Sequence, residues 1–392
     1  MKILLTTDAF YPMINGVVIS THNLYKELKL MGHDVKILTL SEDGRERIDG
    51  DIYYLKSFNL RIYPGTKVKK LFSKEIVDKL LAWKPDIIHS QTEFSTMLDA
   101  KLIAWKLKIP HLHTYHTMYE DYLYYILNGK VISPKTMGLC LKLLLNSLNE
   151  IVAPTEKVKE ALISYGVKTN INIIPTGIDL SKFQRDITEE EKNSLKLQYG
   201  LNSKDKILLY LGRIAQEKNI DSIINMFDNI QDEMKDLKLL IVGSGPYLDN
   251  LKNLVETKGL NNKIFFTGMV EPENVYKYYK IADAFVTSST SETQGLTYIE
   301  ALSTGLPVIC KYDPCIEGVI EQGKNGLVFD NEIEFSNSIK SIFSDENYRK
   351  MLSKHAENTA DKYSSSNFAK TVFQLYETTI ENYNTLLNQN YA

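Results

Sequence analysis

The residues best suited to chemistry form two short runs in the second half of the chain, each after an apolar run typical of a strand. The first run is 291-SETQGLTYIEAL-302, in which Glu292 and Glu300 flank Gly295. A helix that begins at Gly295 and Leu296 presents free backbone N–H groups, which favour an anion such as a diphosphate. We expect Glu300, further along this helix, to accept hydrogen bonds from a ribose diol. Thr293 and Gln294 lie within the same run. The alternative is that the acidic residues only stabilise the helix dipole.

The second run is 212-GRIAQEKN-219, where Arg213 and Lys218 follow another predicted strand. Two fixed cations beside a diphosphate stabilise the negative charge that grows on a leaving nucleotide. The alternative is a structural arginine and a solvated lysine. Because this run accompanies the two glutamates, we interpret both runs as one anion-binding site.

The first half offers two further candidates, Gly16 and His116. Gly16 lies after the first predicted strand, where its backbone can approach a phosphate, although the G-x-G-x-x-G spacing of a dinucleotide site is absent. His116 follows a later strand and is expected at the edge of the cleft. A turn glycine and an ordinary loop histidine are the alternatives. The sequence shows no P-loop, no G-x-S-x-G and no metal-ligand spacing, so we expect no metal and no cofactor.

Apolar strand-like runs alternate with helical patterns in both halves, which predicts parallel sheets covered on both faces. With 392 residues, of which 43% are hydrophobic, the chain suits two α/β domains of the doubly wound, Rossmann-like class. Such domains bind ligands in the cleft at the carboxyl ends of their strands. We expect an N-terminal domain at 1–183, a charged linker at 184–204, a C-terminal domain at 205–366 and a final helix at 367–392 that packs back on the N-terminal domain. The predicted strands are Lys2–Thr7, Asp34–Leu40, Asp51–Lys56, Asp86–Gln91, Pro110–His116, Glu150–Pro154, Ile171–Pro175, Lys206–Arg213, Lys238–Gly243, Lys263–Gly268, Ala282–Ser289 and Leu306–Lys311.

Charge is distributed unequally between the two halves. Residues 1–183 carry 24 Lys and Arg against 19 Asp and Glu, whereas residues 184–392 carry 22 against 30. This asymmetry indicates an anionic partner for the first half, unless it arose by chance. Nucleic acid is disfavoured because no binding module is recognisable, so an anionic membrane surface fits better. The three cysteines lack metal spacing, and no apolar run reaches the length of a spanning helix, which indicates a cytoplasmic protein.

The segment Lys67–Lys84 is the most basic part of the first half. It is expected to form a helix whose apolar stripe includes Phe72 and Trp83, and such a helix can lie in a membrane interface. The alternative is an ordinary crossover helix with a basic outer face. The candidate membrane residues are Lys69, Lys70, Phe72, Lys74 and Trp83. Tyr119, Tyr122, Tyr124 and Tyr125 could form an apolar mouth for acyl chains or belong to the core.

Taken in order, these motifs resemble those of the retaining glycosyltransferases of family 4, which have the GT-B fold, over nearly the full chain. The E-x7-E pair at Glu292 and Glu300 and the GR-x4-K motif at Arg213 and Lys218 match that family's donor-site signature. The stretches ETQGLTYIEAL and HTMYEDY look more specifically like bacterial diacylglycerol glucosyltransferases. Gln294 departs from the wider family, which has an aromatic residue there, and points to this glycolipid subgroup.

The resemblance implies a role for each matching residue. Arg213 and Lys218 would hold the donor diphosphate, Gly16 would supply an N–H group to its phosphate, and Glu300 would hold the ribose. Glu292, with the amides of Gly295 and Leu296, would hold sugar and phosphate, and His116 would lie beside the reacting sugar.

The implied reaction is front-face transfer of a hexose, with UDP-glucose as the expected donor, to diacylglycerol at the inner face of the cell membrane. Three alternatives remain open. The first is another acceptor: a glycosylated diacylglycerol, an inositol or polyprenyl lipid, or a soluble sugar. The second is a nucleotide-sugar-binding module without turnover. The third is a two-domain sugar-nucleotide epimerase, for which no additional acid–base residues are identifiable.

Overall fold

The computed structural model describes residues 1–13, 15–59, 67–69, 74–118 and 134–390. The chain forms two compact units, of which the first contains Met1–Ile178 and Ser365–Ala392 and the second contains Asp179–Ser364. This division differs from the expected linker at 184–204, because Glu189–Gln198 in that stretch forms helix α7 of the second unit. A capping box between Thr188 and Glu191 begins α7, since each side chain accepts a backbone N–H from the other residue.

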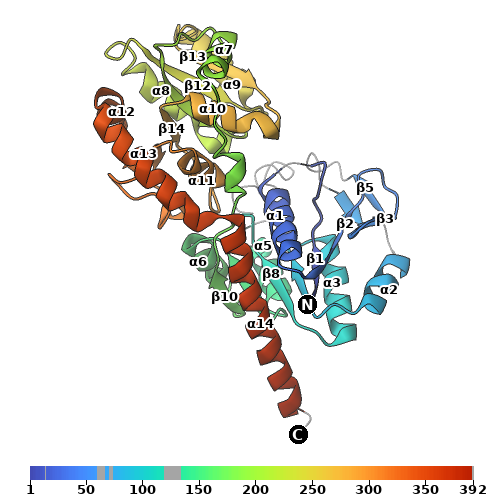
Figure 1. Ribbon diagram of the computed structural model, residues 1–392. Coiled ribbons are helices and arrows are strands. Elements are labelled where there is room, and N and C mark those ends of the chain that lie inside the picture. The colour runs from blue at the N-terminus through green and yellow to red at the C-terminus, as the bar shows by residue number, and fades with distance from the viewer. Residues whose placement is uncertain (14, 60–66, 70–73, 119–133, 391–392) are drawn as a thin grey trace. The chain divides into compact units, whose positions relative to one another are not determined.

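The first unit is built on an eight-stranded sheet with the order β10-β9-β8-β7-β1-β2-β4-β3. Its strands are parallel except for β3, which pairs antiparallel with β4 (Figure 1). The order reverses at β1, because the chain leaves it for β2 on one side and returns to β7 on the other. The strands are β1 (Lys2–Thr6), β2 (Asp34–Leu40), β3 (Arg47–Asp49), β4 (Ile52–Leu55), β7 (Ile87–Ser90), β8 (His111–Thr114), β9 (Glu150–Ala153) and β10 (Asn170–Ile173).

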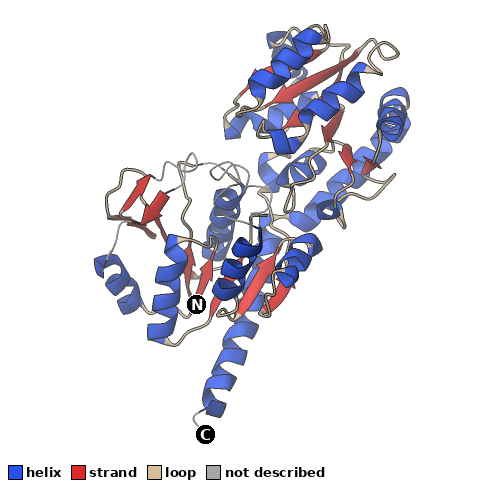
Figure 2. Cartoon of the chain, turned by 180° about the vertical axis from the view of Figure 1, so that it is seen from behind, coloured by secondary structure: helices blue, strands red, loops and turns tan. Residues whose placement is uncertain are grey.

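Helices cover both faces of this sheet (Figure 2). Helices α1 (Gly16–Leu30) and α14 (Ser365–Asn390) pack on one face, against Ile3 and Leu5 of β1. The opposite face receives α2 (Lys74–Trp83), α3 (Ser95–Leu107), α5 (Pro134–Leu145) and α6 (Glu156–Ser164), and Leu4 points to that side. Alternate residues of one strand thus enter different cores, which explains why the strands read as continuous apolar runs.

The second unit contains a parallel six-stranded sheet with the order β13-β12-β11-β14-β15-β16. One face packs against α8 (Ile220–Asp228), α9 (Leu248–Thr257) and α12 (Glu332–Ser344). On the other face, Phe285 contacts aromatic rings of α10 (Val275–Ile281) and α11 (Leu296–Ser303), and α13 (Glu346–Ala360) packs beside α11. The strands are β11 (Lys206–Leu211), β12 (Leu237–Val242), β13 (Ile264–Gly268), β14 (Ala284–Thr287), β15 (Val308–Lys311) and β16 (Gly326–Phe329).

The expected strands are all confirmed, with ends that differ by a few residues. The structure adds β3, β16 and a two-stranded sheet of β5 (Ser57–Asn59) and β6 (Lys67–Lys69), which the sequence did not predict. Each added strand has only three or four residues, too few to display a periodic pattern.

The single helix expected over Lys67–Lys84 is wrong. Lys67–Lys69 forms strand β6, paired with β5, and the helix begins only at Lys74. Lys70 and Phe72 lie outside the described residues, as do Tyr119, Tyr122, Tyr124 and Tyr125. Nothing in the structure therefore bears on the roles suggested for those six residues.

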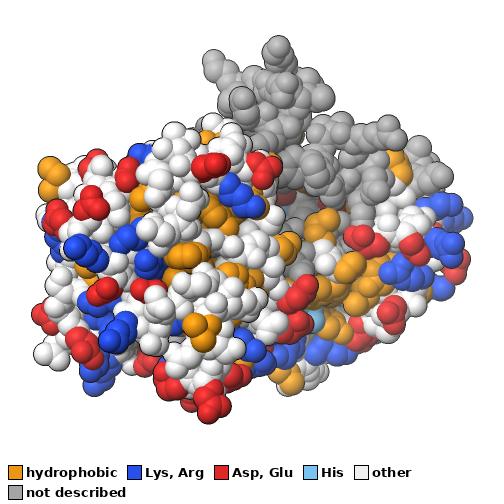
Figure 3. All heavy atoms as spheres, turned by 90° about the horizontal axis from the view of Figure 1, so that it is seen from above, with side chains coloured by type: hydrophobic (Ala, Val, Ile, Leu, Met, Phe, Trp, Pro, Cys, Tyr) orange, Lys and Arg blue, Asp and Glu red, His pale blue; other side chains and the backbone are white. Residues whose placement is uncertain are grey.

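The described candidate membrane residues of that segment differ in their surroundings. The side chain of Lys69 is only 18% exposed and its Nζ lies 2.5 Å from Asp99 Oδ1. Lys74 is exposed, and Trp83 is half-buried and donates through Nε1 to Asp34 at 2.8 Å. Figure 3 shows Lys and Arg side chains interspersed with Asp and Glu side chains on one face of the molecule.

Helix α14 belongs to the first unit although it follows the second in sequence. Phe368, Val372 and Tyr376 are buried in the same cluster as β1 and α1, and the Tyr376 hydroxyl lies 2.6 Å from Nδ1 of buried His89. Burial, with the neighbouring histidines as lesser causes, lowers the pKa of His89 well below its ordinary value, so this ring stays neutral.

We predict that Tyr376→Ala lowers the free energy of unfolding of the first unit by about 3–5 kcal/mol, because it leaves a cavity and removes the partner of His89. Urea unfolding followed by tryptophan fluorescence measures this unit selectively, since both tryptophans of the chain, Trp83 and Trp105, belong to it. The control is Leu386→Ala on the same helix, where the side chain is 58% exposed. Equal effects of the two changes would contradict the assignment of α14 to this core.

Candidate active site

The candidate site of the second unit lies where its strand order reverses. The chain leaves central β11 towards β12 and β13, then returns to β14 on the other side of β11. The loops that follow β11 and β14 consequently diverge from neighbouring strand ends, which is where open α/β sheets bind ligands. The loop after β11 is the run 212–219 singled out above, and the loop after β14, 288–295, contains the beginning of the other run, 291–302.

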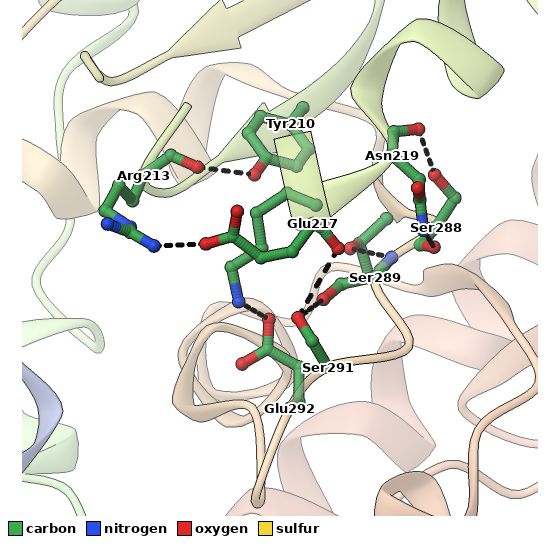
Figure 4. A network of polar contacts seen from close by, with 10 residues as sticks. Tyr210, Arg213, Glu217, Asn219, Ser288, Ser289, Ser291 and Glu292 are labelled. Carbon is green, nitrogen blue, oxygen red and sulfur yellow. Dashed lines mark hydrogen bonds and ion pairs between the residues drawn. The ribbon is translucent and has the colours of Figure 1, made fainter. Parts of the chain in front are cut away.

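Hydrogen bonds join the two loops. Asn219 has a left-handed backbone (φ +50°), and its carbonyl accepts from the Ser288 hydroxyl at 2.6 Å while its side chain donates to the Ser288 carbonyl (Figure 4). Ser291 donates to the carbonyl of Glu217 at 3.4 Å. The positions of the two runs are therefore coupled through the backbone, and asparagine is among the few residues that adopt this conformation readily.

Each predicted cation has a carboxylate beside it. The guanidinium of Arg213 contacts Glu217 within the same loop, and Nζ of Lys218 lies 2.5 Å from Glu292 Oε1 across the two loops (Figure 4). The Lys218 and Glu292 side chains are only 12% and 23% exposed, so their attraction is weakly screened by water. The structure thus brings Arg213, Lys218 and Glu292 together, as the sequence indicated, in a charge-balanced arrangement.

The start of α11 presents the remaining predicted residues. Gly295 has φ +70° and Leu296 is the first helical residue, so the N–H groups of Gly295 and Leu296 precede the hydrogen bond from Tyr298 N to the Gly295 carbonyl, at 3.0 Å, that begins the helix. A Cβ atom at Gly295 would overlap the Tyr298 ring, which explains the glycine. Thr293 is half-buried and Gln294 is buried in the preceding loop.

Glu300 lies on α11 and accepts a hydrogen bond from the Tyr279 hydroxyl of α10 at 2.8 Å. Burial raises the pKa of Glu300, and the hydrogen bond from Tyr279 opposes that shift. Sequence analysis missed Tyr279 because it lies on another helix and carries no motif. It also missed Glu217, although that residue stands inside the 212–219 run.

Gly16 and His116 belong to the first unit, at the carboxyl end of its sheet. Gly16 is exposed at the first position of α1, next to the capping side chain of Asn15, which accepts from Val18 N at 2.9 Å. His116 Nε2 lies 2.9 Å from Gln91 Oε1. Burial, helped by nearby His113, lowers the pKa of His116 to about 3, so the imidazole is neutral near pH 7.

Asp8 is a further, half-buried acid at this sheet edge that the sequence did not single out. Its carboxylate accepts from the Thr92 hydroxyl at 2.6 Å and from Thr96 N at 3.1 Å, which joins the loop after β1 to the start of α3. Burial raises the pKa of Asp8 to about 6 despite these hydrogen bonds. The two loops flanking the reversal at β1 are thereby held together.

Two family descriptions match the chain in succession: Glycosyltransferase Family 4 over residues 14–182 and Glycosyl transferases group 1 over residues 191–359. A protein of Streptococcus pneumoniae named alpha-monoglucosyldiacylglycerol synthase is 35% identical over 96% of this chain and 85% of its own length. The Acholeplasma laidlawii protein of the same name is 32% identical over 99% of this chain and its full length. The chain belongs to glycosyltransferase family 4.

The fold agrees with that assignment. The crystal structure of Anabaena Alr3699/HepE in complex with UDP matches with a TM-score of 0.76, at 16% identity, over 96% of this chain and all of the other. This glycosyltransferase has the GT-B architecture of two Rossmann-like domains, as its sequence predicted. Among the described residues, no group of three or more His, Cys, Asp or Glu side chains is suited to hold a metal ion. None of the described helices is long and apolar enough to cross a membrane.

We predict that Gly295→Ala weakens UDP-glucose binding and speeds amide hydrogen exchange in α11, because the methyl group displaces Tyr298 and adds a backbone strain, together costing about 2–4 kcal/mol. Gly318→Ala is the matched control. Gly318 has φ +77° in the same unit, but a Cβ there would meet nothing within 4 Å. Isothermal titration and hydrogen exchange measure both variants, and similar losses in the two would show that only backbone strain matters at Gly295.

Proposed function

We propose that this glycosyltransferase transfers glucose from UDP-glucose to diacylglycerol at an anionic membrane surface, on the cytoplasmic side, with retention of the anomeric configuration. The observation that carries the proposal is the 35% identity to a monoglucosyldiacylglycerol synthase, which extends over 96% of the chain and so includes both units. The motif residues Arg213, Lys218, Glu292 and Glu300 support a nucleotide-sugar donor, because they surround the start of a helix that suits a diphosphate.

In the proposed donor complex, the two cations exchange partners. Arg213 and Lys218 move from Glu217 and Glu292 to the diphosphate, which carries more negative charge than either carboxylate. Glu292 is then left to face the sugar, where its negative charge stabilises an oxocarbenium-like transition state. The amides of Gly295 and Leu296 bind the phosphates, and Glu300 binds the ribose.

The chemical step forms a bond between the acceptor oxygen and the anomeric carbon while the bond from that carbon to the diphosphate breaks. We assign the acceptor proton to the departing phosphate oxygen, on the same face of the sugar. His116, held neutral by burial, donates or accepts a hydrogen bond at the sugar without adding a positive charge. Because two cations already balance the leaving diphosphate, we propose that no metal ion is required, and activity in EDTA should equal activity in Mg²⁺.

Thin-layer chromatography of products from radiolabelled UDP-glucose or UDP-galactose, with diacylglycerol in mixed vesicles, tests the reaction. We expect a monoglucosyl product from UDP-glucose, and Lys218→Ala should lower the rate by a factor of order 10² to 10³ through loss of one preorganised charge. Lys192→Ala on α7 is the control, since Lys192 pairs with exposed Glu189 on the same helix. The alternative acceptors are a glycosylated diacylglycerol, an inositol or polyprenyl lipid, or a soluble sugar. Transfer to one of these but not to diacylglycerol would show that the acceptor proposed here is wrong. Release of free glucose alone would reject the transfer.

The two glutamates should differ in their effect on binding. Because burial raises the pKa of Glu300, we expect UDP-glucose affinity to fall as the pH is lowered, since the carboxylate becomes protonated at a higher pH than an ordinary glutamate and then accepts ribose hydrogen bonds poorly. Glu300→Gln should weaken binding at pH 7 and abolish this pH dependence. Glu292→Gln should instead lower kcat with little change in affinity. Titration calorimetry between pH 5 and pH 8 with the two variants measures this, and identical pH profiles for Glu300→Gln and the unaltered enzyme would contradict the role of Glu300.

A further inference from the structure

A hydrogen bond between Tyr279 and Glu300 joins two helices on the same face of the sheet in the second unit. Tyr279 lies on α10 and Glu300 on α11, and the Tyr279 hydroxyl donates to Glu300 Oε2 at 2.8 Å. Tyr279 is only 1% exposed, whereas Glu300 is half-buried. The glutamate therefore contacts the interior of the unit while part of the residue reaches its surface.

Two aromatic rings from other segments hold the Tyr279 side chain in place. The Phe183 ring meets the Tyr279 ring edge-on, with centroids 6.0 Å apart and an interplanar angle of 75°. The Phe285 ring of β14 lies at the same centroid distance from it. Such contacts favour a defined ring orientation. They also fix the hydroxyl, because the oxygen lies on the long axis of the ring and does not move when the ring turns about that axis.

Three ionisable groups influence the protonation of this pair. Burial raises the pKa of Glu300, and the hydrogen bond from Tyr279 and the charge of exposed Lys182 oppose that shift. Burial and the charge of Glu300 in turn raise the pKa of Tyr279 well above its ordinary value, with a smaller contribution from Tyr210 of β11. The Tyr279 hydroxyl therefore stays protonated and donates to the carboxylate.

We propose that Tyr279 is a positioning residue that holds Oε2 of Glu300 and so orients the carboxylate to distinguish a ribonucleotide from one without ribose hydroxyls. A glutamate side chain has several rotatable bonds and loses rotamer freedom when it binds a ligand. An acceptor that is oriented in advance avoids that loss and discriminates more strongly against an analogue lacking the hydroxyl groups. This inference rests on the proposed function, which assigns the ribose to Glu300, and adds the residue through which that glutamate becomes selective.

Tyr278, the preceding residue of α10, provides a matched control. It is 6% exposed, and its hydroxyl lies 2.8 Å from the hydroxyl of Tyr199 at the end of α7. Successive residues of a helix are rotated by about 100°, so the two tyrosines face different neighbours. Changing either tyrosine to phenylalanine removes one hydroxyl from a buried ring, but only the change at Tyr279 removes a hydrogen bond to Glu300.

Isothermal titration with UDP and with 2′,3′-dideoxy-UDP, in the absence of lipid, measures the selectivity. We expect the unaltered enzyme to prefer UDP, and Tyr279→Phe to lower the ratio of the two affinities about threefold to tenfold, the range for one hydrogen bond. Affinity for dideoxy-UDP should stay the same, because that ligand has no hydroxyl for Glu300 to bind. Tyr278→Phe should leave the ratio unchanged. A ratio that Tyr279→Phe also leaves unchanged would overturn the proposal.

A double-mutant cycle shows whether Tyr279 acts through Glu300. In Glu300→Ala the preference for UDP should largely disappear, and the addition of Tyr279→Phe should change it no further. Thermal unfolding of the same variants reports separately how each change affects stability. Additive losses of preference in the double variant would show that Tyr279 influences the nucleotide by another route, which would contradict a positioning role.

The pH dependence of UDP affinity gives a readout that a loss of packing alone would not change. The hydrogen bond from Tyr279 favours the charged carboxylate and so lowers the pKa of Glu300. Without that bond the carboxyl group keeps its proton to a higher pH, so the fall in UDP affinity on acidification should begin at a higher pH in Tyr279→Phe. Dideoxy-UDP is the reference for titration of the phosphates, and Tyr278→Phe should follow the unaltered profile. Coincident profiles for Tyr279→Phe and the unaltered enzyme would also reject the proposal.

The outcomes separate this inference from the proposed function. A preference for UDP that Tyr279→Phe lowers, without glucosyl transfer to diacylglycerol, would reject the function and retain the positioning role. Transfer to diacylglycerol with a preference that Tyr279→Phe leaves intact would reject the positioning role alone. Equal affinity of the unaltered enzyme for UDP and dideoxy-UDP would show that Glu300 does not bind the ribose, and so would overturn the inference.

Discussion

Both units depend on one constraint, the burial of a parallel sheet on both of its faces. In the first unit, Ile3 and Leu5 enter one core while Leu4 enters the other, so the middle of β1 has no position for a charged side chain. Polar groups that act on a ligand are therefore confined to the strand ends. At the reversals beside β1 and β11, the loops separate, and these are the places where Asp8, Arg213, Lys218 and Glu292 are found. The arrangement of the chemistry follows from the topology, which in turn follows from the apolar strands.

The charged groups of the donor site are arranged so that none faces the protein interior without compensation. Lys218 and Glu292 neutralise one another with little exposure, Arg213 contacts Glu217, and Glu300 is stabilised by the Tyr279 hydroxyl. A cation that was buried alone would carry a large desolvation penalty. A paired cation can instead be transferred to a diphosphate, because the incoming anion replaces the carboxylate. In the proposed donor complex, the same pairing would leave a carboxylate, Glu292, available at the point where positive charge develops on the sugar.

The sequence predicted most of the framework because the signals that define it are local. Apolar runs identified the long strands, and the motifs around Arg213 and Glu292 lie within loops whose residues are contiguous. What it could not predict depends on contacts between distant segments. Tyr279 reaches Glu300 from another helix, and Asp8 joins Thr92 and Thr96. Short strands such as β6 were missed because three residues show no period.

The segment Lys67–Lys84, which the sequence favoured for membrane contact, shows most clearly what a sequence pattern cannot predict. A run such as Lys67–Lys84 combines lysines with apolar residues, but periodicity does not reveal whether the apolar side is covered by a sheet. In α2 it is covered, so the buried Ile76 and Leu80 contribute to the core and the outer surface is electrically neutral. In α3 the pattern was unremarkable in sequence because apolar residues occupy both sides, as is usual for a helix buried all round. Only the structure shows that Leu98 and Trp105 of α3 are 64% and 76% exposed while Met97 and Ala100 are fully buried.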